Sequence, residues 1–118
     1  MPPREERDVI VRRGAGRKLD LPHKKLKKEL LTPDLSGALQ MLLVNIEPGG
    51  STGGESYSHP GEECGWMLEG KLDLWVGERH FHLRRGDSFR FKSELPHRSF
   101  NPGKSVARLI WVTSPPFY

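Results

Sequence analysis

Apolar and polar residues alternate along several short segments of this chain, and the alternation is clearest toward its C-terminal end. Residues 87–91 place Phe89 and Phe91 on one face. Residues 106–113 alternate in the same way, with Arg108 on the face opposite to the apolar residues. Because successive side chains of a strand point to opposite faces, a period of two predicts half-buried β-strands in both segments.

Further apolar segments of similar length precede these two and are separated by Gly and Pro. Residues 39–47 are rich in Leu, Val and Ile and stop at Pro48, which predicts a central strand with both faces covered. Residues 26–31 lie between Pro22 and Pro33, which favours a strand over a single helical turn. The remaining expected strands are residues 8–13, 17–21, 64–68, 72–76 and 79–83.

Glycine-containing pairs mark the tightest turns between these strands. We expect Glu69-Gly70 to close a hairpin between the strands that flank it, and Gly77-Glu78 to form the next turn. Short strands with close turns throughout, and at most one or two helical turns, predict an all-β protein built as a double-sheet jelly roll.

Composition agrees with one small domain. A chain of 118 residues can bury about two thirds of its unfolded surface, and Cys64 is its one cysteine, which excludes an internal disulfide and suits a reducing compartment. No apolar run reaches membrane-spanning length, and the first residues lack the apolar core of a secretory signal. We expect a cytoplasmic protein without membrane contact, with residues 1–7 as a flexible basic tail or linker and residues 8–118 as a single β-barrel domain.

Positive charge is concentrated at the start of the chain. Residues 1–28 hold ten Lys and Arg against four Asp and Glu, whereas the rest of the chain is slightly acidic. Such an arm could attract a phosphate backbone, or it could be a solvated sheet edge on which lysines discourage pairing with other chains. We favour the solvated edge, because no aromatic residues are interleaved with the basic ones as stacking sites.

Two short blocks carry the residues with metal-ligand chemistry. In the first block His59 precedes Glu63 by four residues, and Gly70 follows. In the second block His97 precedes Asn101. Two imidazoles and one carboxylate on strand-like segments suit a divalent metal such as Zn, Fe, Mn or Ni.

These blocks resemble the paired motifs of the cupin superfamily. In the first cupin motif two His are followed by a Glu and a Gly; here Tyr57 stands at the position of the first His, and His59, Glu63 and Gly70 match the rest. His97 matches the second motif, whose internal Pro-x-Gly is not kept. The resemblance implies the cupin double-stranded β-helix, a jelly-roll barrel, with His59, Glu63 and His97 as metal ligands and Tyr57 or water completing the shell.

The runs 59–74 and 95–103 narrow the resemblance to one branch of small cupins. In that branch the barrel follows an N-terminal helix-turn-helix of the repressor type. The resemblance implies the sensor domain of a transcription regulator, which binds a small polar effector and contacts DNA only through a helix-turn-helix that these residues do not contain.

Strand parity predicts which side chains line the barrel. Glu63 shares parity with Gly65 and Met67 and should face the interior, where a carboxylate needs a metal, another cation or a His partner. A hydrogen-bonded cluster of His59, Glu63 and His97 without metal is the alternative. The expected ligand-binding residues are Tyr57, His59, Glu63, His97, Ser99, Met41 and Trp111.

A metal-dependent enzyme, of the dioxygenase or isomerase type, is the second candidate for the function. Two His and one carboxylate form the set that such oxygenases use. No further acid or base is recognisable beside the ligand set, so we assign no catalytic residue and favour the sensor over the enzyme. A stand-alone binding protein is the third class.

Assembly and a second group of histidines complete the expectations. Residues 9–13 offer a strand that could pair across a two-fold axis, which predicts a homodimer.

His80 and His82 share a face that should point outward, away from the site. Cys64 and Trp66 have parity opposite to Glu63 and should lie between layers or at an interface.

Overall fold

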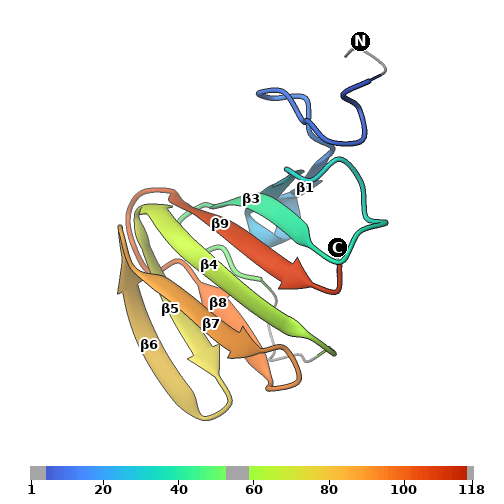
Figure 1. The fold of residues 1–118 in the computed structure, drawn as a ribbon. Helices are drawn as coiled ribbons and strands as arrows, with labels where there is room; N and C mark the ends of the chain where they lie inside the picture. Colours follow the sequence, from blue (N-terminus) through green and yellow to red (C-terminus); the bar gives the residue numbers. More distant parts are fainter. Residues whose placement is uncertain (1–4, 53–58, 117–118) are drawn as a thin grey trace.

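A computed structural model describes residues 5–52 and 59–116, and Tyr57 lies outside these ranges. The described residues form two antiparallel sheets that face each other (Figure 1). The larger sheet has the order β1-β2-β3-β9-β4-β7, and the smaller one has the order β6-β5-β8. The strands are β1 (Lys18–Leu21), β2 (Leu26–Leu30), β3 (Gln40–Ile46), β4 (Glu62–Glu69), β5 (Lys71–Val76), β6 (Arg79–Arg84), β7 (Ser88–Lys92), β8 (His97–Phe100) and β9 (Ala107–Ser114).

Helix is almost absent from the described residues, as the sequence predicts. Within them the one helical element is a three-residue 3-10 turn, η1 (Pro22–Lys24), and Lys25 ends it in the left-handed conformation. This part of the chain therefore contains no helix-turn-helix, and none of its helices is long and apolar enough to cross a bilayer. The all-β jelly-roll prediction is confirmed.

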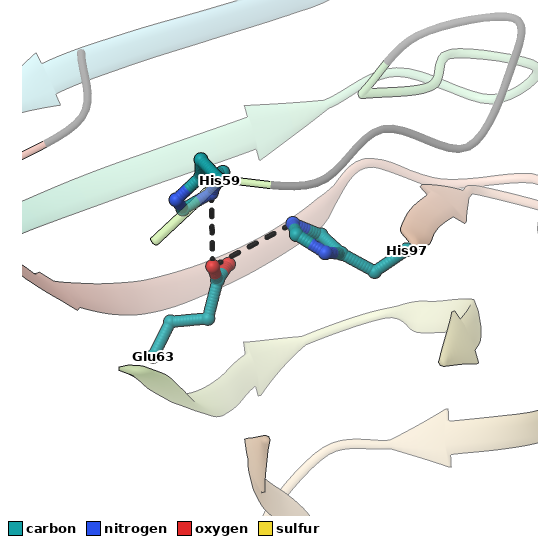
Figure 2. A group of neighbouring side chains, drawn as sticks. All are labelled: His59, Glu63 and His97. Atoms are coloured by element: carbon teal, nitrogen blue, oxygen red, sulfur yellow. Dashed lines mark ion pairs between the residues drawn. The ribbon is translucent and has the colours of Figure 1, made fainter. Parts of the chain in front are cut away.

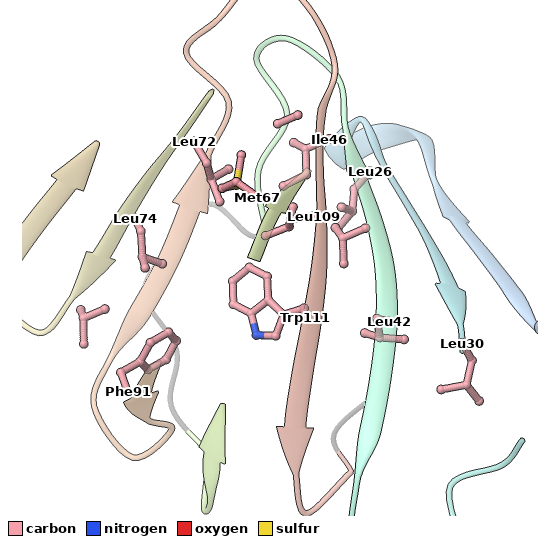
Figure 3. Packing of buried hydrophobic residues seen from close by; sticks show 13 residues of the cluster. Leu26, Leu30, Leu42, Ile46, Met67, Leu72, Leu74, Phe91, Leu109 and Trp111 are labelled. Carbon is pink, nitrogen blue, oxygen red and sulfur yellow. The ribbon is translucent and has the colours of Figure 1, made fainter. Parts of the chain in front are cut away.

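The core lies between the two sheets (Figure 3). β9 shows why: its residues alternate between a buried and a less buried position, and Leu109 is completely buried. Each such Leu or Ile contributes roughly 1.5–3 kcal/mol by leaving water. The buried hydrophobic residues are Leu26, Leu30, Leu42, Val44, Ile46, Met67, Leu72, Leu74, Val76, Phe91, Ala107, Leu109 and Trp111.

The hairpin expected at Glu69-Gly70 is wrong, although both of its strands exist. β4 pairs with β7 and β9, whereas β5 pairs with β6 and β8, so the chain passes from the larger sheet to the smaller one at Gly70. Gly70 has a φ of +80°, and a Cβ there would lie 2.6 Å from the carbonyl oxygen of Val106. Alternation indicates a strand but not its partner, and here consecutive strands belong to opposite sheets. The turn at Gly77 does close a hairpin, between β5 and β6.

β3 is covered on one face only, contrary to the prediction from its apolar composition. Its even-numbered residues are buried, but Met41 on the other face is 36 % exposed. Both neighbours of β3, β2 and β9, are antiparallel to it, and an antiparallel sheet can leave one face to solvent.

The strand expected over residues 8–13 is also wrong. The chain turns there, with the backbone N–H groups of Val9 and Ile10 both donating to the carbonyl oxygen of Glu6. Arg12 closes the same turn through a bidentate contact with the Glu6 carboxylate. Local hydrogen bonds thus replace the sheet ladder that this segment would need as a strand.

Candidate functional site

The two sheets bring His59, Glu63 and His97 together inside the barrel (Figure 2). Glu63 is on β4 of the larger sheet, His97 begins β8 of the smaller one, and His59 lies just before β4. His59 Nε2 is 3.1 Å and His97 Nε2 is 3.5 Å from the same carboxylate oxygen, Glu63 Oε2. The two imidazole rings are 5.2 Å apart and nearly perpendicular. We name these three residues the barrel triad.

All three side chains of the barrel triad are buried, with exposed fractions of 4 %, 3 % and 1 % for His59, Glu63 and His97. A carboxylate removed from water in this way is costly unless polar or cationic partners surround it. The position of Glu63 is therefore a feature that the fold maintains against a free-energy cost.

Two hydrogen-bond donors hold the Glu63 carboxylate in place. Ser93 donates its hydroxyl to Oε2 at 2.6 Å, and Trp111 donates its indole N–H to Oε1 at 2.7 Å. Ser93 follows β7, and Trp111 is on β9, the two strands that flank β4. Both oxygens are thus oriented before any ligand arrives.

Backbone carbonyls orient the two imidazoles. His97 Nδ1 lies 2.7 Å from the carbonyl oxygen of Leu95, and His59 Nδ1 lies 3.3 Å from that of Pro60. A carbonyl oxygen only accepts, so each Nδ1 carries the hydrogen, and the Nε2 atom of a neutral ring presents a lone pair.

Three lone-pair donors then converge on one point, which favours a cation between them. The three donor atoms lie within 4.8 Å of one another. An imidazole that donates its other N–H to a carbonyl is the usual arrangement of a metal-binding His. Two His and one carboxylate leave further coordination positions open. The residues present therefore fit a divalent metal.

Buried polar residues extend from Glu63 across the larger sheet. Thr113 stands directly opposite Glu63 on β9, and Gln40 stands opposite Thr113 on β3. Both are buried, at 4 % and 0 % exposure. Farther along the sheet, Val44, Leu109 and Met67 stand side by side and are apolar, and Lys28 on β2 stands next to Val44 in the same row. This end of the barrel interior is thus the polar one.

Lys28 was not expected from the sequence as a site residue, yet it points into the barrel interior. Lys28 shares parity on β2 with Leu26 and Leu30, both of them 2 % exposed. Burial lowers the pKa of the Lys28 ammonium, the neighbouring Lys24 lowers it further, and the negative charge of Glu63 acts in the opposite direction. Lys28 therefore lies close enough to the barrel triad to sense its charge. Its parity with two leucines is the pattern that could have revealed it.

The other expected lining residues divide into two groups. Ser99 is buried on β8 with the parity of His97, and its hydroxyl and backbone N–H both contact Thr52 Oγ1. Trp111 contacts Glu63 directly, as described above. Met41 is on the opposite, outer face of the larger sheet, so its expected place in the lining is wrong, because its parity on β3 is that of the exposed residues.

A separate hollow of about 660 Å³ lies away from the barrel triad, at the beginning of β5 rather than at the end that pairs with His97. Its lining includes the basic residues Lys71, Arg84, Arg85 and Lys104. None of the barrel triad lines it, so we do not connect it with the site.

Comparisons with known proteins agree with this architecture. Over 77 residues, 65 % of this chain, the sequence is 34 % identical to the HTH-type transcriptional regulator PuuR of Escherichia coli strain K12, and the match spans 41 % of that regulator. A solved RmlC-like cupin from Shewanella frigidimarina superposes with a TM-score of 0.76 at 19 % identity, covering 92 % of this chain and 91 % of that one.

The solved cupin domain of an XRE family transcriptional regulator from Enterobacter cloacae superposes with a TM-score of 0.69 at 19 % identity. It covers 79 % of this chain and 99 % of its own. The family model of the cupin domain matches residues 42–113, which include the whole barrel triad. This chain therefore belongs to the cupin domain family, and it resembles the cupin domains of helix-turn-helix regulators.

Proposed function

We propose that this chain is a cupin sensor domain that binds a small polar effector at the barrel triad and acts for a transcription regulator. The observation that carries the proposal is the Glu63 carboxylate, buried between two imidazoles and fixed by Ser93 and Trp111. A mostly apolar interior with a few convergent polar groups is the usual form of a small-molecule site. The similarity to PuuR supports the regulatory role.

The charges in the interior support an effector that is itself polar or charged. Glu63 suits an amine, whereas the ammonium of Lys28 suits a carboxylate. An effector that carries both groups, such as an amino acid or a related small acid, would satisfy both sides. Tyr57 is part of this proposal as a further donor, although it lies outside the described residues.

A divalent metal held by His59, Glu63 and His97 is part of the same proposal. Such an ion would supply Lewis acidity toward an oxygen or nitrogen atom of the effector. Ser93 and Trp111 keep the carboxylate oriented, and the carbonyls of Pro60 and Leu95 keep the imidazoles oriented.

A thermal-shift screen of amines, amino acids and small acids tests the effector site. A ligand at a hundred times its dissociation constant stabilises the folded state by about 2.7 kcal/mol. We expect Glu63→Gln and Tyr57→Phe to reduce the shift, and Glu78→Gln, an exposed carboxylate in a turn, to leave it unchanged. A shift that survives Glu63→Gln would place the ligand elsewhere and contradict the proposal.

A metal-dependent enzyme is the second candidate, and Lys28 is the observation that favours it. A lysine whose pKa is lowered by burial, and which feels the negative charge of Glu63, is a group that can exchange a proton with a bound substrate. Steady turnover of a thermal-shift hit, lost in both His97→Ala and Lys28→Met, would favour the enzyme over the sensor.

The homodimer remains a proposal, but the proposed contact moves from residues 9–13 to the outer face of the larger sheet. There Trp66 is 50 % exposed, and Met41 and Cys64 lie on the same face. An exposed apolar face of this kind favours packing against a second copy. Light scattering should find a dimer at micromolar concentration that Trp66→Glu dissociates. Val9→Glu, at a residue that is 66 % exposed in the N-terminal turn, should leave the dimer intact, and a monomeric wild type would contradict the proposal.

In a sensor, occupancy of the barrel triad must reach a DNA-binding module. The effector therefore has to bind one arrangement of the dimer more tightly than another, since equal affinity for both would shift nothing. A helix-turn-helix outside these residues would make the DNA contacts, and a protein in that role would be cytoplasmic.

A further inference from the structure

The outer face of the smaller sheet carries a second group of metal-ligand side chains. Asp73 and Trp75 on β5 stand opposite His82 and His80 on β6, respectively. The residues that alternate with Asp73 and Trp75 are buried in the core, among them Leu74. Asp73, His80 and His82 therefore point away from the barrel triad, on the other side of the sheet.

The three side chains converge on the Asp73 carboxylate. His82 Nδ1 lies 2.6 Å from Asp73 Oδ1, and His80 Nε2 lies 3.7 Å from Asp73 Oδ2. Their donor atoms all fall within 4.8 Å of one another. His82 is close enough to donate a hydrogen bond, but His80 is not, so a hydrogen-bonded pair accounts for only one of the two imidazoles.

Neighbouring side chains hold this arrangement in place. The His80 ring stacks on Trp75 with 4.2 Å between centroids and 8° between planes. From the strand on the other side of Trp75, Arg98 places its guanidinium 3.7 Å from the indole centroid. The Asp73 side chain is only 13 % exposed, whereas those of His80 and His82 are 39 % and 75 % exposed. The carboxylate is thus fixed in the sheet, and the imidazoles are open to solvent.

We propose that Asp73, His80 and His82 form a second divalent-metal site, on the outer face of the smaller sheet. Two imidazole nitrogens and one carboxylate oxygen suit Zn²⁺, Ni²⁺ or Cu²⁺. Zn²⁺ takes such nitrogens at about 2.0–2.1 Å, and the remaining coordination positions face water. This inference is independent of the proposed function, because it involves none of the residues of the barrel triad.

Zinc titration followed by NMR of the histidine rings tests the site. Tag-free protein stripped with chelator is titrated with Zn²⁺ alone, and ring ¹H–¹⁵N correlations assigned by single His→Gln variants report each imidazole separately. We expect saturable shifts at His80 and His82, whatever happens at the barrel triad. Asp73→Asn and His82→Gln should each weaken zinc binding at His80 by at least about 10–100-fold, the loss that is typical when only a hydrogen-bond partner of a ligand is removed.

His23→Gln is the matched control, because His23 lies in η1, outside the cluster, and the substitution should change nothing at His80 and His82. The outcome that overturns the proposal is an absence of shifts at both rings up to millimolar Zn²⁺. Equal zinc affinity at His80 in the wild type, Asp73→Asn and His82→Gln would overturn it as well. His82 is largely exposed, so its substitution should leave the fold intact even if Asp73→Asn does not.

Discussion

Trp111 Nε1 donates a 2.7 Å hydrogen bond to Glu63 Oε1, and so links β9 to β4 inside the barrel. The Trp111 ring also contacts Phe89 edge to face, with 4.9 Å between centroids. One indole thus belongs to the apolar core and also contacts the barrel triad. The packing of the core and the position of the buried carboxylate are coupled through this residue.

Trp111→Phe should destabilise the protein by about 1–3 kcal/mol, because it removes a donor from a buried carboxylate oxygen. Urea denaturation of the variant and the wild type measures the difference in free energy of unfolding. Trp66→Phe is the control. The Trp66 side chain is half exposed, and its indole N–H donates a 3.3 Å hydrogen bond to the carbonyl oxygen of Gly86. Equal losses in the two variants would mean that the contact with Glu63 has no special importance.

Gly65→Ala should disturb the packing next to the barrel triad, because Gly65 lies two residues from Glu63 on the same face of β4. A Cβ at Gly65 would collide with the Phe89 ring, and it would lie 2.8 Å from the carbonyl oxygen of Ile110. Overpacking of this kind costs about 1–3 kcal/mol. Gly37→Ala, where a Cβ meets nothing within 4 Å, should be close to neutral in the same thermal or urea unfolding experiment. A neutral Gly65→Ala would show that Phe89 and Trp111 can shift freely.

Lys28 should make stability depend on pH in the alkaline range. Its pKa in the folded state is lowered, chiefly by burial, so the unfolded chain holds this proton to higher pH than the folded chain. The cost of burying the ammonium is fully present below the folded pKa and is relieved as the pH rises through it toward the unfolded value. The wild type should therefore gain stability relative to Lys28→Met over this range.

Urea denaturation of wild type and Lys28→Met from about pH 7 to about pH 10 measures this difference. Lys27→Met serves as the control, since Lys27 is the exposed neighbour on the other face of β2. If the difference between wild type and Lys28→Met does not change with pH, the inward position of Lys28 is wrong.

Most strands were predictable from the sequence, because the alternation of apolar and polar residues is local. The pairing of each strand with its neighbours in a sheet was not predictable. The alternation of β9 and the turn at Gly77 both follow from a few neighbouring residues. The crossing from one sheet to the other at Gly70 depends instead on contacts with Val106, far along the chain. The strand expected over residues 8–13 does not form, because the backbone N–H groups of Val9 and Ile10 donate locally to the carbonyl oxygen of Glu6.

The barrel triad was predictable because motif spacing and parity identify His59, Glu63 and His97 without knowledge of the partners of each strand. The contact of Ser93 with Glu63 was not predictable, since Ser93 follows β7 in a turn, where strand parity does not determine the direction of a side chain. Met41 was expected in the lining but lies on the outer face, and apolar character alone does not distinguish a core face from an exposed apolar face. The outward position of His80 and His82 was predicted correctly, but the convergence of both on Asp73 depends on the register of β5 and β6.

Metal content of paired variants tests the central claim most directly. The protein, purified without chelator or metal-affinity tag, is measured by elemental analysis in a His80→Gln, His82→Gln background. Among the residues that the structure describes, the barrel triad is then the one remaining cluster of metal-ligand side chains. We predict a bound divalent ion in this background and its loss when His97→Ala or Glu63→Gln is added, because the ion needs all three donors. Absence of any ion in the background, or retention of the ion after His97→Ala, would contradict the account.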